Sequence, residues 1–129
     1  MKEEVHDWKD DEEISRYLAR LLNKDAFDHA GLIYGVGHAV YSKSDPRAVI
    51  FKGFVERLSE EKGLHDEFEL YNSVERLAPA VIAKERQMYK GVSVNVDFYS
   101  GFVYEMIGLP QEIFTPLFAM ARIVGWCAH

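Results

Sequence analysis

The chain has 129 residues, a length that suits one domain, and at 48% hydrophobic and 28% charged it is able to bury a core. Its formal net charge of −6 disfavours general affinity for nucleic acid, and its single cysteine, Cys127, excludes an internal disulfide. No apolar run approaches the roughly 20 residues needed to cross a bilayer, and the acidic N-terminus does not resemble a targeting signal, so we expect a cytoplasmic protein with no membrane partner.

The first predicted helix begins at Asp10 or Asp11, either of which is a suitable N-cap, and reaches about Leu22. A loop punctuated by glycines covers residues 23–44. Asp45-Pro46 then starts a second helix, because aspartate caps and proline lacks the N–H that a first turn leaves unbonded. This helix is expected to reach about Glu61, with an inner face made of Val49, Ile50, Phe54, Val55 and Leu58.

A third helix is predicted from about Leu64 to Tyr89, with Pro79 expected to kink it or divide it in two. Residues 92–96 alternate in polarity, which allows at most a short extended segment. One such segment cannot form a sheet by itself.

A fourth helix is predicted from about Val96 to Ile107, and a fifth begins at Leu109-Pro110 with an irregular first turn near Pro116. The pattern therefore predicts an all-α domain of about five helices. The fifth helix is still apolar where the sequence stops, so we expect the chain to be a piece of a longer protein. Trp8 and Trp126 are both assigned to packing.

The segment Gly35-Val36-Gly37-His38 places a histidine directly after two glycines. Glycine lets the backbone approach a ligand closely, and the imidazole is then able to point into a cleft. The alternative is a loop histidine that only caps or faces solvent. The segment is not a dinucleotide signature, because no strand precedes it and the third glycine is missing.

Two arginines stand in unusual places. Arg47 lies in the first turn of the second helix, where the positive helix end disfavours a cation unless an anion sits between them. Arg122 lies within an apolar stretch and must reach an acid, a ligand or water. For both arginines, a structural ion pair is the alternative to a ligand contact.

Asp97 opens the fourth helix, where backbone N–H groups are able to fix a carboxylate as a simple cap. Gly101 follows one turn later and costs about 1 kcal/mol relative to alanine, so we expect tight helix packing there. The sequence shows no Cys-x-x-Cys, His-Glu-x-x-His or acidic calcium loop, and hence no recognisable metal site.

Taken together, the motifs resemble the citrate synthase family. GVGHAVYSKSDPRA and NVDFYSG lie about fifty residues apart and are followed by FAMARIVGWCAH. The similarity covers nearly the whole chain, and residues 1–129 resemble the small, all-helical domain of these enzymes. In the family this domain closes over a larger helical domain, with the active site between them.

The resemblance implies roles for four residues. His38 matches the histidine that polarises the oxaloacetate carbonyl, and Asp97 matches the general base that takes a proton from the methyl group of acetyl-CoA. Arg47 and Arg122 match the arginines that hold oxaloacetate carboxylates. These roles suit the chemistry, since a thioester α-proton is weakly acidic and its removal requires a positioned base.

The resemblance also implies contact with coenzyme A through Val36 and Gly37. Lys43 is the candidate for the basic residue that some members direct at the coenzyme phosphates. Acetyl-CoA and CoA are then substrate and product, and no permanently bound cofactor is expected. The second family histidine and an arginine from the neighbouring subunit are absent, so we expect this chain alone to be inactive.

Several interpretations remain open at this point. The parent protein is expected to be a homodimeric citrate synthase, and the chain alone is expected to self-associate through faces left uncovered. The nearest alternative is a 2-methylcitrate synthase that uses propionyl-CoA, since one methylene is worth only about 1–3 kcal/mol. A non-catalytic helical module that binds an acyl-CoA or a protein, and a domain whose charges are all structural, are further alternatives.

Overall fold

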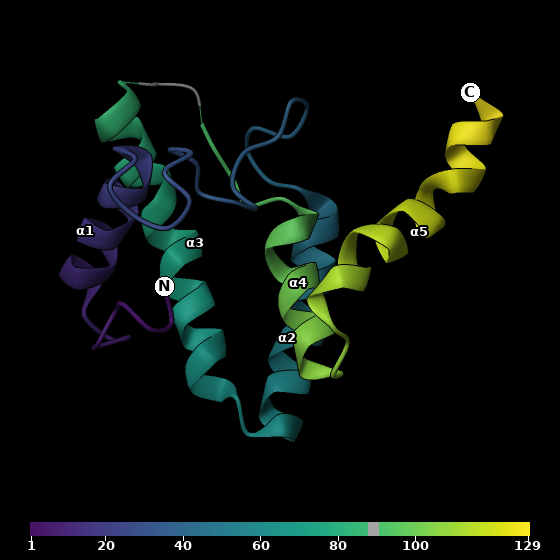
Figure 1. Cartoon of the computed structure of the whole chain (residues 1–129), viewed down its shortest axis with the longest axis horizontal. Coiled ribbons are helices and arrows are strands. Elements are labelled where there is room, and N and C mark those ends of the chain that lie inside the picture. Colours follow the sequence, from purple (N-terminus) through teal and green to yellow (C-terminus); the bar gives the residue numbers. More distant parts are fainter. Residues whose placement is uncertain (88–90) are drawn as a thin grey trace.

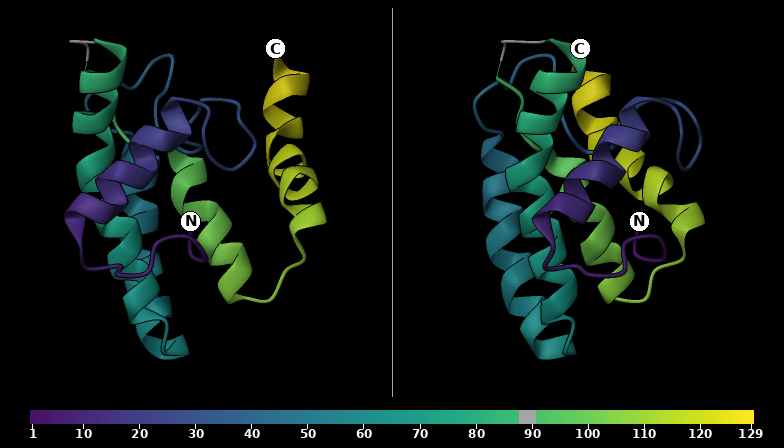
Figure 2. Two further views of the ribbon diagram at one scale, coloured as in Figure 1. Left: turned by 60° about the vertical axis from the view of Figure 1, so that its left-hand side comes forward. Right: turned by 90° about the vertical axis from the view of Figure 1, so that its left-hand side faces the viewer.

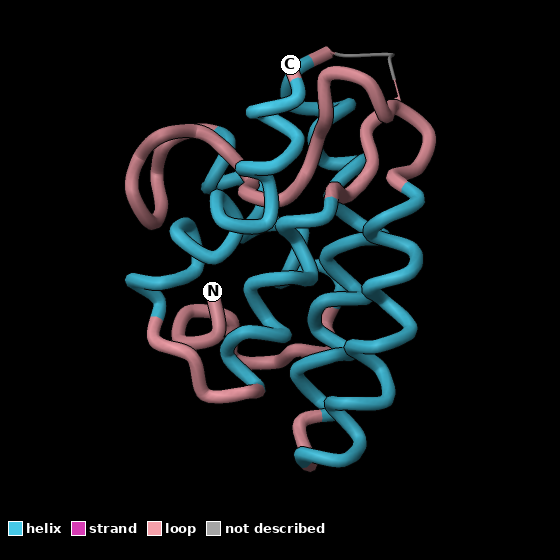
Figure 3. The backbone as a smooth tube through the Cα atoms, turned by 90° about the vertical axis from the view of Figure 1, so that its right-hand side faces the viewer, coloured by secondary structure: helices cyan, strands magenta, loops and turns pink. Residues whose placement is uncertain are grey.

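The computed structural model describes residues 1–87 and 91–129. Within them the chain forms helices and loops without a named strand (Figures 1 and 3). In chain order the elements are α1 (Asp11–Leu22), α2 (Pro46–Lys62), α3 (His65–Arg86), α4 (Val96–Met106), the 3-10 turn η1 (Gln111–Ile113) and α5 (Phe114–Ala128). The prediction of an all-α fold with five helices is confirmed. The predicted end of the third helix at Tyr89 lies outside the described residues.

The helix starts follow from local capping. The side chains of Asp10, Asp45 and Asn95 each accept a hydrogen bond from a backbone N–H in the first turn of α1, α2 and α4, respectively. Gly63 ends α2 with a φ of 69°, a conformation that suits glycine.

Pro79 lies inside α3, which is one helix from His65 to Arg86, so of the two predicted outcomes, a kink or a division, the division does not occur. The physical reason is packing on both sides of the proline. Val74, Ala78 and Ile82 are buried in the core, which offsets the backbone hydrogen bond that proline cannot make.

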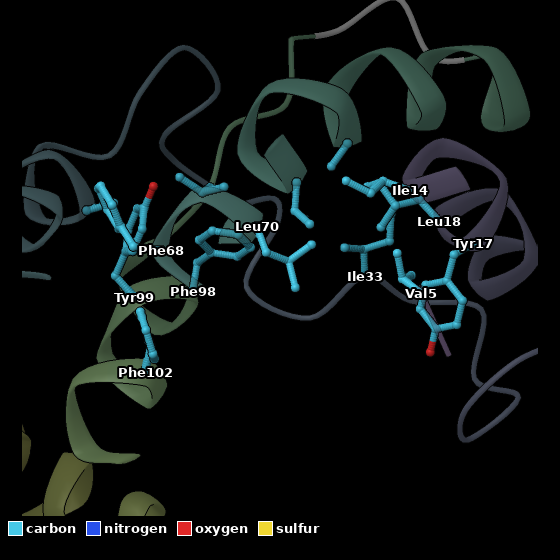
Figure 4. Close-up of a cluster of buried hydrophobic side chains, with 14 of the residues drawn as sticks. Val5, Ile14, Tyr17, Leu18, Ile33, Phe68, Leu70, Phe98, Tyr99 and Phe102 are labelled. Carbon is cyan, nitrogen blue, oxygen red and sulfur yellow. The ribbon is translucent and has the colours of Figure 1, made fainter. Parts of the chain in front are cut away.

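The core lies between α3 and its neighbours: α1 packs on α3, while α2 packs on both α3 and α4. Figure 4 shows aromatic side chains from α3 and α4 on one side and, on the other, mainly aliphatic side chains from α1, the N-terminal segment and the loop after α1. Within the aromatic group, Tyr71 stacks on Phe102 with ring centroids 4.6 Å apart. Because α2 packs against α4, this core fixes the two helices relative to each other.

The predicted inner face of α2 is only partly correct. Val55 is fully buried, but Val49, Ile50 and Phe54 are 62%, 63% and 55% exposed. The helix instead buries Ala48, Val55 and Ser59, because these are the residues that face α3 and α4. Part of the apolar stripe on α2 therefore faces outward.

No residue of α5 is buried, and the helix stands apart from α1–α4 (Figure 2). Trp126 is 60% exposed, so its assignment to packing is wrong for this chain, whereas Trp8 does pack against the core. None of the helices in the described part of the chain has the length and apolar character to span a membrane.

Candidate functional site

A short antiparallel pairing joins the glycine loop to the start of α4. Residues 35–37 lie against residues 93–95, with the Gly37 N–H donating to the Ser93 carbonyl at 2.8 Å. The Asn95 side-chain amide donates to the Gly37 carbonyl, also at 2.8 Å. We call this pairing the loop–helix clamp. It brings the residue after Gly37 close to the N-terminus of α4.

The clamp requires glycine at position 35. Gly35 has a φ of +78°, and a Cβ there would lie 2.7 Å from the Phe98 Cα. No side chain fits at that distance, so the loop reaches α4 only because this residue has none.

The clamp is followed by His38, whose ring orientation is fixed. Its Nδ1 accepts hydrogen bonds from the backbone N–H groups of Val40 and Tyr41 at 3.0 and 3.2 Å. A neutral ring that accepts at Nδ1 carries its proton on Nε2, which is then a donor. His38 is exposed, so this donor is accessible to a ligand.

Arg47 is oriented by the cap of its own helix. Asp45, 1% exposed, accepts hydrogen bonds from Arg47 Nε at 3.0 Å and Nη2 at 2.8 Å. This bidentate pair holds the pKa of Asp45 below its usual range. The pKa of Arg47 is raised, chiefly by its hydrogen bond to Asp45 and further by the negative charge of that carboxylate.

The His38 and Arg47 donors face the same point. Arg47 Nη2 lies 3.4 Å from His38 Nε2. Because both nitrogens carry protons in the neutral His38 tautomer, neither satisfies the other. An acceptor atom placed between them would receive a hydrogen bond from each, as a carbonyl or carboxylate oxygen does.

Asp97 does not cap its helix. Asn95 does, accepting from the Asp97 backbone N–H at 3.0 Å, so the interpretation of Asp97 as a simple cap is wrong. The Asp97 side chain is exposed and accepts no hydrogen bond from residues in the described part of the chain. Its carboxylate is therefore available as a base.

Beside Asp97 lies a pocket of about 340 Å³ between α4 and the start of α5. A Cβ built at Gly101 would meet nothing within 4 Å, so the expected tight helix packing there is wrong. The missing side chain instead leaves space in the pocket. Its lining residues are Asp97, Ser100, Gly101, Tyr104, Phe114, Thr115 and Phe118.

Arg122 is not assembled with the other candidates. Its guanidinium lies 4.9 Å from the centroid of the Phe118 ring, and within the described residues it forms no ion pair with an acidic side chain. Phe118 lines the Asp97 pocket, so α5 carries Arg122 near that pocket without a contact to His38 or Arg47.

A second pocket, of about 490 Å³, is lined in part by Val36, Gly37 and His38 of the glycine loop. Lys43 is exposed and lies outside its lining. Arg86 lines the pocket and donates to the Gly31 carbonyl at 2.8 Å. Arg86 is not among the residues predicted from the sequence, because its only signal there is that of a basic residue in the last turn of a helix.

Within the described residues, no group of three or more potential metal-binding side chains comes together.

Residues 1–129 match the family described as citrate synthase, C-terminal domain. The chain belongs to the citrate synthase family. It is 41% identical over 121 residues to the citrate synthase of Acidithiobacillus ferridurans, covering 92% of this chain and 28% of the relative. It is 36% identical over 127 residues to the citrate synthase of Helicobacter pylori, a match that covers 98% of this chain and 28% of that relative. This chain thus spans little more than a quarter of the length of these curated relatives.

A solved structure supports the same family. The citrate synthase of Thermoplasma acidophilum, in a ternary complex with carboxymethyl coenzyme A and oxaloacetate, matches with a TM-score of 0.70 and 33% sequence identity. The match covers 98% of this chain and 32% of that one. The five-helix arrangement is therefore that of one part of a citrate synthase.

Proposed function

We propose that this chain is the part of a citrate synthase that supplies the general base and holds oxaloacetate. The parent enzyme condenses acetyl-CoA with oxaloacetate and water to give citrate and CoA. The observation that carries the proposal is the convergence of two donors, His38 Nε2 and Arg47 Nη2 at 3.4 Å, with the exposed Asp97 at the start of α4, the helix packed against α2.

Each residue has a defined task in this reaction. His38 donates from Nε2 to the oxaloacetate carbonyl, which makes its carbon more electrophilic. Arg47 binds a carboxylate of oxaloacetate, and Arg122 binds one once the rest of the enzyme fixes α5. Asp97 removes a proton from the acetyl-CoA methyl group, and the resulting nucleophilic carbon attacks the polarised carbonyl.

In this proposal, acetyl-CoA binds beside the loop–helix clamp. We assign Val36 and Gly37 to coenzyme A, since they line the 490 Å³ pocket next to His38. The exposed Lys43 is free to approach a coenzyme phosphate. The acyl group then extends toward Asp97.

The test is an oxaloacetate titration of the intact enzyme that contains this domain, with citrate formation followed in the same samples. Asp97→Ala should bind oxaloacetate normally and lose about 10²–10⁴-fold in turnover, as expected for loss of a general base. Arg47→Ala should weaken oxaloacetate binding by about ten- to hundredfold.

Matched controls are Asp66→Ala, an acid in the first turn of α3, and Arg57→Ala, a second arginine of α2. Both should behave like wild type. If Asp97→Ala and Arg47→Ala also bind and turn over normally, the motifs are structural and the proposal fails. Comparison of acetyl-CoA with propionyl-CoA in the same assay decides between citrate and 2-methylcitrate formation.

A further inference from the structure

A single carboxylate on α3 joins α2 and α4, the helices that carry Arg47 and Asp97. Glu75 of α3 accepts at one oxygen, Oε2, from Lys52 Nζ of α2 at 2.5 Å and from the Tyr99 hydroxyl of α4 at 2.7 Å. Nothing in the catalytic roles assigned above uses these three residues. We call them the Glu75 network.

The two arms of the network lie close in sequence to the assigned residues. Lys52 follows Arg47 by five residues on α2, and Tyr99 follows Asp97 by two residues on α4. Each arm therefore holds the first turns of a helix whose N-terminal end carries an assigned residue. Glu75 accepts both hydrogen bonds, and its helix, α3, carries none of the residues assigned to catalysis or binding.

The Tyr99 arm is buried. The Tyr99 side chain is 0% exposed, and burial together with its hydrogen bond to Glu75 raises the pKa of its hydroxyl. A buried hydroxyl requires a partner, and phenylalanine would fill the same space without that requirement. Apolar contacts tolerate small rotations of a helix about its axis, whereas a hydrogen bond is directional.

We propose that Glu75 is a positioning residue that fixes Arg47 and Asp97 relative to each other, through Lys52 and Tyr99. The inference rests on the function proposed above. It predicts that the two arms act on different steps, because the Lys52 arm orients the helix that binds oxaloacetate and the Tyr99 arm orients the helix that carries the base.

The experiment measures KM for oxaloacetate and kcat separately in the intact enzyme. Tyr99→Phe removes only the hydroxyl and should lower kcat about tenfold with KM for oxaloacetate unchanged, because a base displaced by a fraction of an ångström transfers protons less efficiently. Lys52→Met should raise that KM several-fold with kcat unchanged. Glu75→Ala should do both, and Glu75→Gln, which keeps an acceptor oxygen, should restore most of each loss.

The matched control is Arg76→Met. Arg76 Nη2 pairs with Asp11 Oδ1 at 2.7 Å and joins α3 to α1, neither of which carries an assigned residue. This variant should leave both kinetic constants unchanged. If the Glu75 network is purely structural, its variants should all have a lower melting temperature, but Tyr99→Phe should not act on kcat alone and Lys52→Met should not act on KM alone. That result overturns the inference.

Asp97→Ala and Arg47→Ala are assayed in parallel. Suppose that they show the losses described above, but that Tyr99→Phe and Lys52→Met do not affect kcat and KM separately. Then only the positioning role of Glu75 fails. If Asp97→Ala and Arg47→Ala themselves resemble wild type, the proposed function fails first.

Discussion

Asp45 joins two tasks in one buried side chain. It caps α2 through the Arg47 backbone N–H at 2.9 Å, and its carboxylate also holds the Arg47 guanidinium. Asparagine caps helices about as well as aspartate but carries no charge. Asp45→Asn therefore separates the ion pair from the cap.

Asp45→Asn should lower the free energy of unfolding at neutral pH by about 1–3 kcal/mol, the usual worth of a hydrogen bond to a charged group. Because the folded pKa of Asp45 is depressed, the unfolded chain takes up the proton first as the pH falls. The contribution is present above the unfolded pKa and is lost as the pH falls through the folded one. Urea unfolding at a series of pH values below about 5 should show the difference between variant and wild type shrinking.

The same substitution in an Arg47→Ala background provides the control. There the carboxylate has lost its partner, so Asp45→Asn should change the unfolding free energy much less. An equal effect in both backgrounds would show that the ion pair contributes nothing.

Gly101 illustrates a residue that costs stability and keeps a pocket open. It lies in α4 with nothing within 4 Å of a built Cβ, so alanine fits without a clash. Gly101→Ala should raise the unfolding free energy of the chain by about 1 kcal/mol. In the intact enzyme the same change should lower turnover, because the added methyl group enters the Asp97 pocket.

Differential scanning calorimetry and a citrate assay test the two halves of this prediction. Gly53→Ala in α2, also with nothing within 4 Å of its Cβ, is the matched control, since it lies outside the Asp97 pocket. It should gain stability and keep full turnover. Unchanged turnover in Gly101→Ala would show that the pocket is not used.

At the scale of the elements, Asn95 joins the glycine loop to α4. Its side chain caps α4 through Oδ1 and anchors the glycine loop through Nδ2. Asn95→Ala should cost about 1–2 kcal/mol from the lost cap and should also loosen the loop that carries His38. Asn95→Asp keeps the cap but loses the amide donor.

Comparing the two variants by thermal unfolding and by amide exchange separates the effects. Asn95→Asp should retain the stability of α4 yet expose the Gly37 region to faster exchange. If the two variants are indistinguishable by both measurements, the clamp is not held by the Asn95 amide.

Much of this element scale could be predicted from the sequence, because capping is local. Asp45-Pro46 and the apolar spacing of α1 are readable from a few neighbouring residues. The exposure of Val49 and Ile50 could not be predicted in this way, because it depends on which face of α2 packs against α3 and α4. The continuity of α3 through Pro79 likewise depends on tertiary packing.

The site divides in the same way. His38, Arg47 and Asp97 stand in short motifs, so the sequence alone allows them to be proposed as site residues. Two hydrogen bonds of the site depend on the three-dimensional structure, and no spacing rule predicts them. Arg47 donates to Asp45, and the Asn95 side chain donates to the Gly37 carbonyl. Arg122 lies on α5, in which no residue is buried.

At the scale of the whole molecule, apolar surface is the dominant feature. Exposed large side chains lie on α2 and α5, including Ile50, Phe54, Ile123 and Val124. Soluble monomers rarely expose extended apolar patches, so the isolated chain should self-associate. Sedimentation velocity over a wide concentration range should show dimers or larger species.

Val124→Lys, on the face of α5, should shift this equilibrium toward monomer. Val40→Lys is the matched control, because Val40 is similarly exposed, at 76% against 77% for Val124, but lies in a loop outside these helices. A chain that stays strictly monomeric at high concentration contradicts the prediction.

The loop–helix clamp also determines when the site forms during folding. The Asn95–Gly37 hydrogen bond joins residues 58 positions apart, with α2 and α3 lying in the intervening chain. Closing so long a loop is slow compared with forming a helix, so α2 and α3 are expected to form before His38 and Asp97 are brought to the same end of the fold. A nascent or partly refolded chain then has nearly complete helix content and no assembled site. Circular dichroism would report such a chain as folded before it is able to bind oxaloacetate.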